Sequence, residues 1–125
     1  MNAADLLVIH KDWAWLVVVS NGLAGLWSLA AHQWPALRKT AMWWFIGAAQ
    51  LSVVVQVILG VIVVNKLKVE LPKLHAFYGF VAIIAAAIVY SYRYQMKHRL
   101  YLLYGFGSLF IMGLALRAMY IGLSR

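Results

Sequence analysis

Four histidines lie where their side chains could bind a metal or a cofactor. His10 comes just before a long apolar stretch and His75 begins another, whereas His32 and His98 follow the ends of such stretches. Neutral imidazole is a strong nitrogen donor, so two histidines that converge between facing helices could hold a metal ion or a haem iron from both sides. We take all four as candidate cofactor-binding residues, in the pairs His10 with His75 and His32 with His98.

The spacing of the histidines also suggests an internal repeat. The two members of each pair are 65 and 66 residues apart, and IHKDWAWLVVV and LHAFYGFVAII both place aromatic residues three and five positions after the histidine. A two-fold relation between helix pairs, about an axis along the membrane normal, would bring each histidine pair together. At the helical rise the two levels would be about 33 to 35 Å apart. The two pairs would therefore lie at opposite ends of the molecule.

Four apolar stretches without Asp, Glu, Lys or Arg must position these residues, namely 13–31, 41–64, 74–92 and 100–116. A helix needs about 20 residues to cross the hydrocarbon of a bilayer, so each stretch is long enough or nearly so. Apolar residues resume after Arg117, and we expect the last span to reach about residue 122 with Arg117 extended to the lipid headgroups. The connectors are short, which favours antiparallel neighbours. We predict an all-α membrane protein, a single domain over residues 1–125 folded as an up-down-up-down four-helix bundle.

Composition narrows the possible partners. The chain is 66% hydrophobic with a mean hydropathy of +0.84, which leaves no material for a soluble domain. Its net charge of +8 sits near the ends of the apolar stretches, where anionic lipids attract basic residues, so we expect membrane lipids and not nucleic acid as partners. The residues expected at lipid headgroups are Arg38, Lys39, Arg93, Lys97, Arg99 and Arg117. The absence of cysteine excludes disulfides and thiolate metal sites.

The distribution of Lys and Arg gives little information on orientation. Six of these residues fall on the side of the termini and the middle connector, and five fall on the other side, together the 11 of the sequence. We expect a location in the cytoplasmic (inner) membrane, and the denser clusters at residues 38–39 and 93–99 favour an orientation with both termini outside. Dual topology stays open.

Polar side chains inside the apolar stretches are expected to join helices. Asn21 lies as many residues after the start of the first stretch as Gln56 lies before the end of the second, and Ser28 and Gln50 match in nearly the same way. In antiparallel helices the members of each pair would therefore lie at about the same depth. An amide that faces lipid is unfavourable, so we predict hydrogen-bonded pairs of Asn21 with Gln56 and of Ser28 with Gln50, between these helices or across a subunit interface. The alternative is that these side chains line a polar pathway.

Part of the sequence points to a known family. A histidine opens the first stretch, Ala-Gly-Leu-Trp follows at residues 24–27, His32 closes it, and LHAFYGF opens the third stretch. This pattern resembles the small four-helix b-type haem proteins of bacterial membranes, including the membrane protoporphyrinogen oxidases. The resemblance implies haem b bound inside the bundle, with His10 and His75 as the residues that carry over. The chain lacks that oxidase family's lysine within a span and its Asn-Glu-x-Pro segment, so the oxidase activity is not carried over.

The inventory of residues offers no catalytic site. General acid-base work needs paired carboxylates in a cleft, whereas the three acids lie outside the apolar stretches, with Asp5 expected in a mobile tail. We predict a protein that acts by binding, as a non-catalytic subunit of a larger membrane complex or as a homo-oligomer. Two alternatives stay open, a b-type haem protein in electron transfer or haem handling, and a small-solute transporter or channel.

Overall fold

The computed structural model describes residues 2–68 and 72–123, and the regular elements in these ranges are all helices. Within them lie four α-helices, α1 (Ala3–Gln33), α2 (Thr40–Leu67), α3 (Lys73–Ser91) and α4 (Leu100–Leu123), with short 3-10 helices η1 (Pro35–Leu37) and η2 (Lys97–Arg99) in the connectors. Each α-helix is long and apolar enough to cross a membrane. The predicted spans lie inside these helices, except that α3 ends at Ser91, one residue before the predicted end.

Helix α1 begins ten residues before Trp13, where its apolar stretch starts. The Asn2 side chain accepts a hydrogen bond from the Asp5 amide at 2.9 Å, and the Asp5 carboxylate accepts one from the Asn2 amide at 3.4 Å. This capping box satisfies amides that have no partner within the helix. The expectation of Asp5 in a mobile tail is therefore wrong. The extension matters because it makes His10 part of a regular helix.

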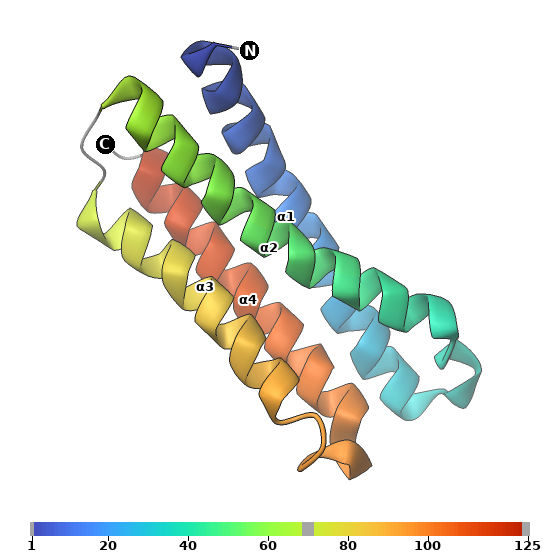
Figure 1. Ribbon diagram of the computed structural model, residues 1–125. Coiled ribbons are helices and arrows are strands. Elements are labelled where there is room, and N and C mark those ends of the chain that lie inside the picture. Colours follow the sequence, from blue (N-terminus) through green and yellow to red (C-terminus); the bar gives the residue numbers. More distant parts are fainter. Residues whose placement is uncertain (1, 69–71, 124–125) are drawn as a thin grey trace.

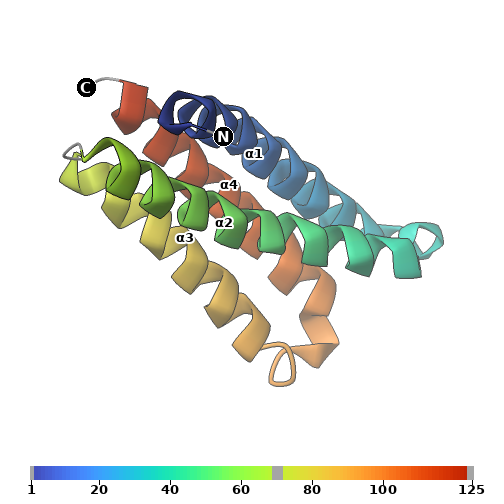
Figure 2. The same cartoon turned by 45° about the horizontal axis from the view of Figure 1, so that its top comes forward.

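The helices gather at one end and separate at the other (Figures 1 and 2). Helix α1 packs against α2 and α4, and α3 packs against α4, whereas α2 and α3 make few contacts. The start of α1, the end of α2, the start of α3 and the end of α4 lie together. We call this the histidine end (residues 3–17, 53–67, 73–82 and 115–122). The connectors that contain η1 and η2 lie apart at the opposite, aromatic end (residues 24–45 and 89–104).

Many of the buried residues are small, and many of the large apolar residues are exposed. A Cβ atom at Gly25 of α1 would lie 2.9 Å from the carbonyl oxygen of Gly105 in α4, so the two backbones meet where no side chain fits. Ala24 and Ala82 are also buried, whereas Trp44 of α2 is 77% exposed. Close approach through small residues is typical of helices that pack in membranes. The large exposed apolar side chains would be unfavourable in water.

Candidate functional site

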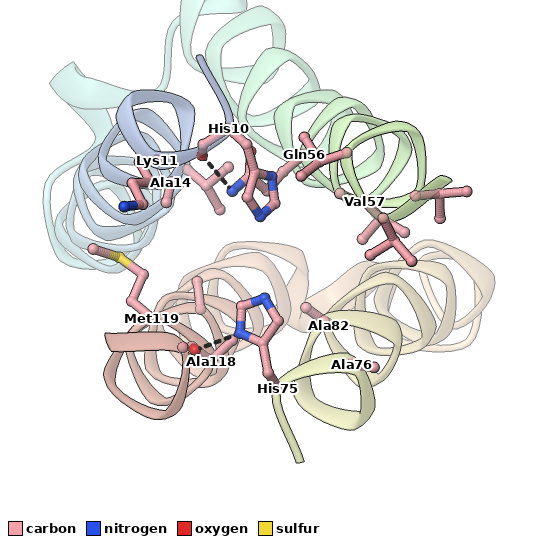
Figure 3. Close-up of a pocket in the computed structure, with 18 of the residues that line it drawn as sticks. His10, Lys11, Ala14, Gln56, Val57, His75, Ala76, Ala82, Ala118 and Met119 are labelled. Atoms are coloured by element: carbon pink, nitrogen blue, oxygen red, sulfur yellow. Dashed lines mark hydrogen bonds between the residues drawn. The ribbon is translucent and has the colours of Figure 1, made fainter. Parts of the chain in front are cut away.

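The histidine end contains a partly open cavity of about 670 Å³ (Figure 3). Residues of α1, α2, α3 and α4 line it, and many are small: Ala14, Gly60, Gly79, Ala82, Ala118 and Gly122. No atom lies within 4 Å of the Cβ position of Gly79. Helices α2 and α3 make few contacts, and the small side chains that face the space between them leave it unfilled. The volume falls within the roughly 300 to 1,000 Å³ of small-molecule and cofactor sites.

His10 of α1 and His75 of α3 project into this cavity and point toward one another (Figure 3). Their ring centroids are 6.3 Å apart, and the ring planes are inclined by 81°. A metal ion bonded at about 2.0 to 2.1 Å to one nitrogen of each of two opposed imidazoles would hold the ring centres about 6 Å apart. The observed separation therefore fits two imidazoles that bind one metal centre from opposite sides.

The ring of His75 is fixed by a hydrogen bond to α4. Its Nδ1 lies 2.7 Å from the carbonyl oxygen of Ala118. A carbonyl only accepts, so Nδ1 carries the hydrogen and Nε2 keeps its lone pair. On the same side, a Cβ atom at Gly122 would lie 3.0 Å from Nδ1. The neutral ring therefore has its electron-pair donor already selected, as in metal sites where a second ring nitrogen donates to a carbonyl.

The ring of His10 has no such support. The main-chain carbonyl of His10 accepts a hydrogen bond of 2.8 Å from Gln56 Nε2, which ties α1 to α2. The ring nitrogen Nδ1 is buried without a hydrogen-bond partner. A Cβ atom at Gly60 would lie 3.1 Å from Cε1 of the ring. The imidazole thus fits against α2 because residue 60 has no side chain, but only its backbone is held by a hydrogen bond.

The structure does not bring His32 and His98 together. His32 lies in the last turn of α1, whereas His98 is exposed in η2 and lines a small surface pocket of about 160 Å³. The connectors that follow α1 and α3 diverge in both views (Figures 1 and 2). In the described ranges, the one ring contact between histidines is that of His10 with His75.

The predicted pairing of Asn21 with Gln56 is wrong. Asn21 Nδ2 donates to the carbonyl oxygens of Val17 at 2.9 Å and of Ala49, in α2, at 3.2 Å. Gln56 donates to His10 instead. Gln56 of α2 contacts α1 at His10, whereas Asn21 of α1 contacts α2 at Ala49. Asn21 therefore lies opposite a position seven residues before Gln56. Counting from the ends of the apolar stretches predicted the wrong register of α1 against α2, because α1 begins well before its apolar stretch does.

The pairing of Ser28 with Gln50 is also wrong. The Ser28 hydroxyl donates to the carbonyl oxygen of Tyr101 in α4 at 2.7 Å. Gln50 Nε2 is buried without a hydrogen-bond partner. Ser28 therefore joins α1 to α4, a contact that equal depths along α1 and α2 could not reveal.

Three of the arginines expected at lipid headgroups have contacts in the structure, and the Arg117 guanidinium lies 5.8 Å from the ring centroid of Tyr120. Arg38 caps α1 through its Nε, 2.8 Å from the Ala31 carbonyl oxygen, and its Nη2, 3.0 Å from that of His32. The Arg93 guanidinium lies 3.6 Å from the ring centroid of Tyr90. The exposed members of the set are Arg38, Lys39, Lys97, Arg99 and Arg117, and Arg93 is half-buried. For all six, contact with lipid stays a prediction.

No family model, curated protein or solved structure matches this chain. The chemistry of the site therefore has to follow from its own residues. Within residues 2–68 and 72–123, no group of three or more His, Cys, Asp or Glu side chains is placed to hold a metal ion. A bare zinc ion needs three or four protein ligands, but a haem brings its own ring of nitrogens and needs axial ligands alone. Two opposed imidazoles in a roomy, largely apolar cavity fit the second case.

Proposed function

We propose that this chain is a membrane protein that binds a b-type haem between His10 and His75. The observation that carries the proposal is the 6.3 Å separation of two imidazoles that face each other across a cavity of about 670 Å³. This is the first alternative raised by the sequence. It now takes precedence over a subunit without a cofactor, because two imidazoles converge at a cavity with room for such a group.

The residues around the cavity fit such a group in three respects. His75 presents the lone pair of Nε2, because its Nδ1 donates to Ala118. His10 faces it from α1, at a spacing suited to two axial ligands. Apolar and small side chains give room for a flat ring in a largely apolar environment. A bound haem would supply one-electron redox chemistry, while these residues hold and orient it.

We further propose that α1 to α4 cross the cytoplasmic membrane in up-down-up-down order, with both termini outside. The large apolar side chains on the outer surface, such as Leu26, Trp44 and Phe106, support a lipid environment. The histidine end would then lie near the outer face. Association with a larger membrane complex or with further copies of the chain stays a prediction. The transporter alternative loses support, because Asn21 and Gln56 are engaged in contacts between helices.

Absorption spectroscopy tests the haem proposal. The protein is produced with ample haem, purified in detergent and measured in oxidised and reduced forms. We expect a Soret band from equimolar haem, with the sharp visible bands of a low-spin iron that has two imidazole ligands. His75→Ala should lose these bands, and His10→Ala should lose the low-spin spectrum. His32→Ala and His98→Ala are the matched controls and should keep both. Absence of haem from the wild-type protein, or equal losses in all four variants, contradicts the proposal.

A further inference from the structure

The two imidazoles at the cavity are not equivalent. Rotation of the His75 ring would break its hydrogen bond to Ala118, whose Nδ1 to oxygen distance is 2.7 Å. Rotation of the His10 ring breaks no hydrogen bond of that ring in the described part of the chain, since its Nδ1 has no partner. A buried donor that has lost its acceptor is unfavourable, so among the described residues a hydrogen bond opposes rotation of the His75 ring and none opposes rotation of the His10 ring.

The main chain of His10 nevertheless stays fixed. Gln56 Nε2 holds the His10 carbonyl at 2.8 Å, and Trp13 Nε1, one turn further along α1, donates to the Ser52 carbonyl oxygen at 2.8 Å. These bonds join α1 to α2 without involving the imidazole. The ring can therefore leave its position while the helix that carries it remains docked.

We infer that His75 is the anchoring ligand of the site and His10 is the exchangeable one, which gives way to a small neutral molecule that enters the cavity. The inference rests on the proposed haem binding and adds which of the two histidines holds the group more tightly. A ligand with an outer hydrogen bond has a fixed tautomer and greater basicity, and loss of such a bond weakens metal affinity by about 10- to 100-fold. The difference between the two histidines should be of that order.

The preference of His75 for one tautomer can be measured without any haem. In the haem-free protein labelled with ¹⁵N-histidine, the nitrogen chemical shifts of His75 should report a hydrogen on Nδ1 and a free Nε2. Those of His10 should report no such fixed preference. His75→Ala and His10→Ala assign the signals. A hydrogen fixed on Nε2 of His75 would overturn the inference, whatever the outcome of the haem experiment.

Haem titration and carbon monoxide then test the order of the ligands. We expect His75→Ala to weaken haem affinity at least about tenfold more than His10→Ala does. Carbon monoxide added to the reduced wild-type protein should bind in place of His10, so the spectrum of the wild-type protein with carbon monoxide should coincide with that of His10→Ala with carbon monoxide. If wild-type protein takes up haem but both variants lose equal affinity, or if carbon monoxide does not bind, the inference fails while the haem proposal stands.

Two glycines provide variants that retain both histidines. A methyl group at residue 122 would press on Nδ1 of His75 and disturb its bond to Ala118, whereas one at residue 60 would press on Cε1 of His10. Gly122→Ala should therefore weaken haem affinity about tenfold or more, as expected for a lost outer hydrogen bond. Gly60→Ala should leave the affinity nearly unchanged and speed the binding of carbon monoxide. The reverse order of these effects would assign the anchoring role to His10 and overturn the inference.

Discussion

The two ends of the bundle are built from the same helices but are filled in opposite ways. At the aromatic end, Trp43 of α2 contacts the rings of Tyr101 and Tyr104 in α4, with centroids 5.5 and 5.4 Å apart. Trp27 and Phe45 add a further ring contact between α1 and α2 at 6.0 Å. At the histidine end several glycines and alanines are among the residues around the corresponding space, which stays open. Large rings thus fill one end, and two imidazoles face each other across a hollow at the other.

This difference separates stability from binding. A cavity forgoes the packing contacts that side chains of full size would make, so the histidine end contributes less to stability than a filled core would. The aromatic end compensates, because its rings bridge α2 to α4 and α1 to α2. The Trp27 indole also donates to the Leu37 carbonyl oxygen at 2.9 Å, which fixes the connector. The comparison predicts that substitutions at one end change stability and those at the other change ligand affinity.

The largest expected effect on stability comes from Trp43→Ala. Loss of this partly buried ring, which touches Tyr101 and Tyr104, should lower the free energy of unfolding in mixed micelles by about 3 kcal/mol. Haem affinity should change little. The neighbouring Trp44 is 77% exposed, so Trp44→Ala is the matched control, with an expected change below about 0.5 kcal/mol. Equal losses from the two substitutions would mean that the aromatic end is not the stabilising half.

A large side chain placed in the cavity should have the opposite effect, namely a loss of haem affinity without a loss of stability. Gly79 lines the cavity with free space at its Cβ position, so Gly79→Leu should occupy the volume and weaken haem affinity at least about tenfold. The haem-free protein should gain about 1 kcal/mol in its free energy of unfolding, because leucine favours the helix more than glycine does. Gly47→Leu, at an exposed position of α2, should give the same gain with unchanged haem affinity. Unaltered haem binding by Gly79→Leu would show that the ligand lies elsewhere.

The sequence predicted the helices better than it predicted how they meet. Stretches without charge located α1 to α4, because a charged side chain is unfavourable in hydrocarbon. The start of α1 was missed because Lys11 and Asp12 interrupt the apolar pattern, although Asn2 and Asp5 carry a capping signal that could have found it. That error in length is what displaced the expected partner of Asn21.

The histidine site was predictable in part. Spacing placed His10 near His75, but the same spacing also paired His32 with His98, which the diverging connectors keep apart. The contacts that distinguish the two members of the near pair come from the Ala118 carbonyl and from the absence of a side chain at Gly60. A backbone carbonyl has no sequence signature. A glycine shows its role only when the facing side chain is known.

The smallest expected effect concerns two contacts between α1 and α2, one within the histidine end and one between the two ends. Asn21 and Gln56 each donate to a backbone carbonyl of the facing helix, with Ala49 and His10 as separate partners. Asn21→Leu and Gln56→Leu should therefore each lower the free energy of unfolding by about 0.6 kcal/mol. Each substitution also removes a buried amide oxygen that lacks a partner, which offsets part of this loss. In a double-mutant cycle their coupling should stay below about 0.3 to 0.5 kcal/mol, as for independent sites. Side chains in direct contact typically show a coupling of about 1 kcal/mol. A coupling of that size or more would mean that Asn21 and Gln56 touch, and that α1 and α2 meet in the register predicted from equal depths. His10 would then be displaced along α2, and the contrast between a hollow end and a filled end would fail with it.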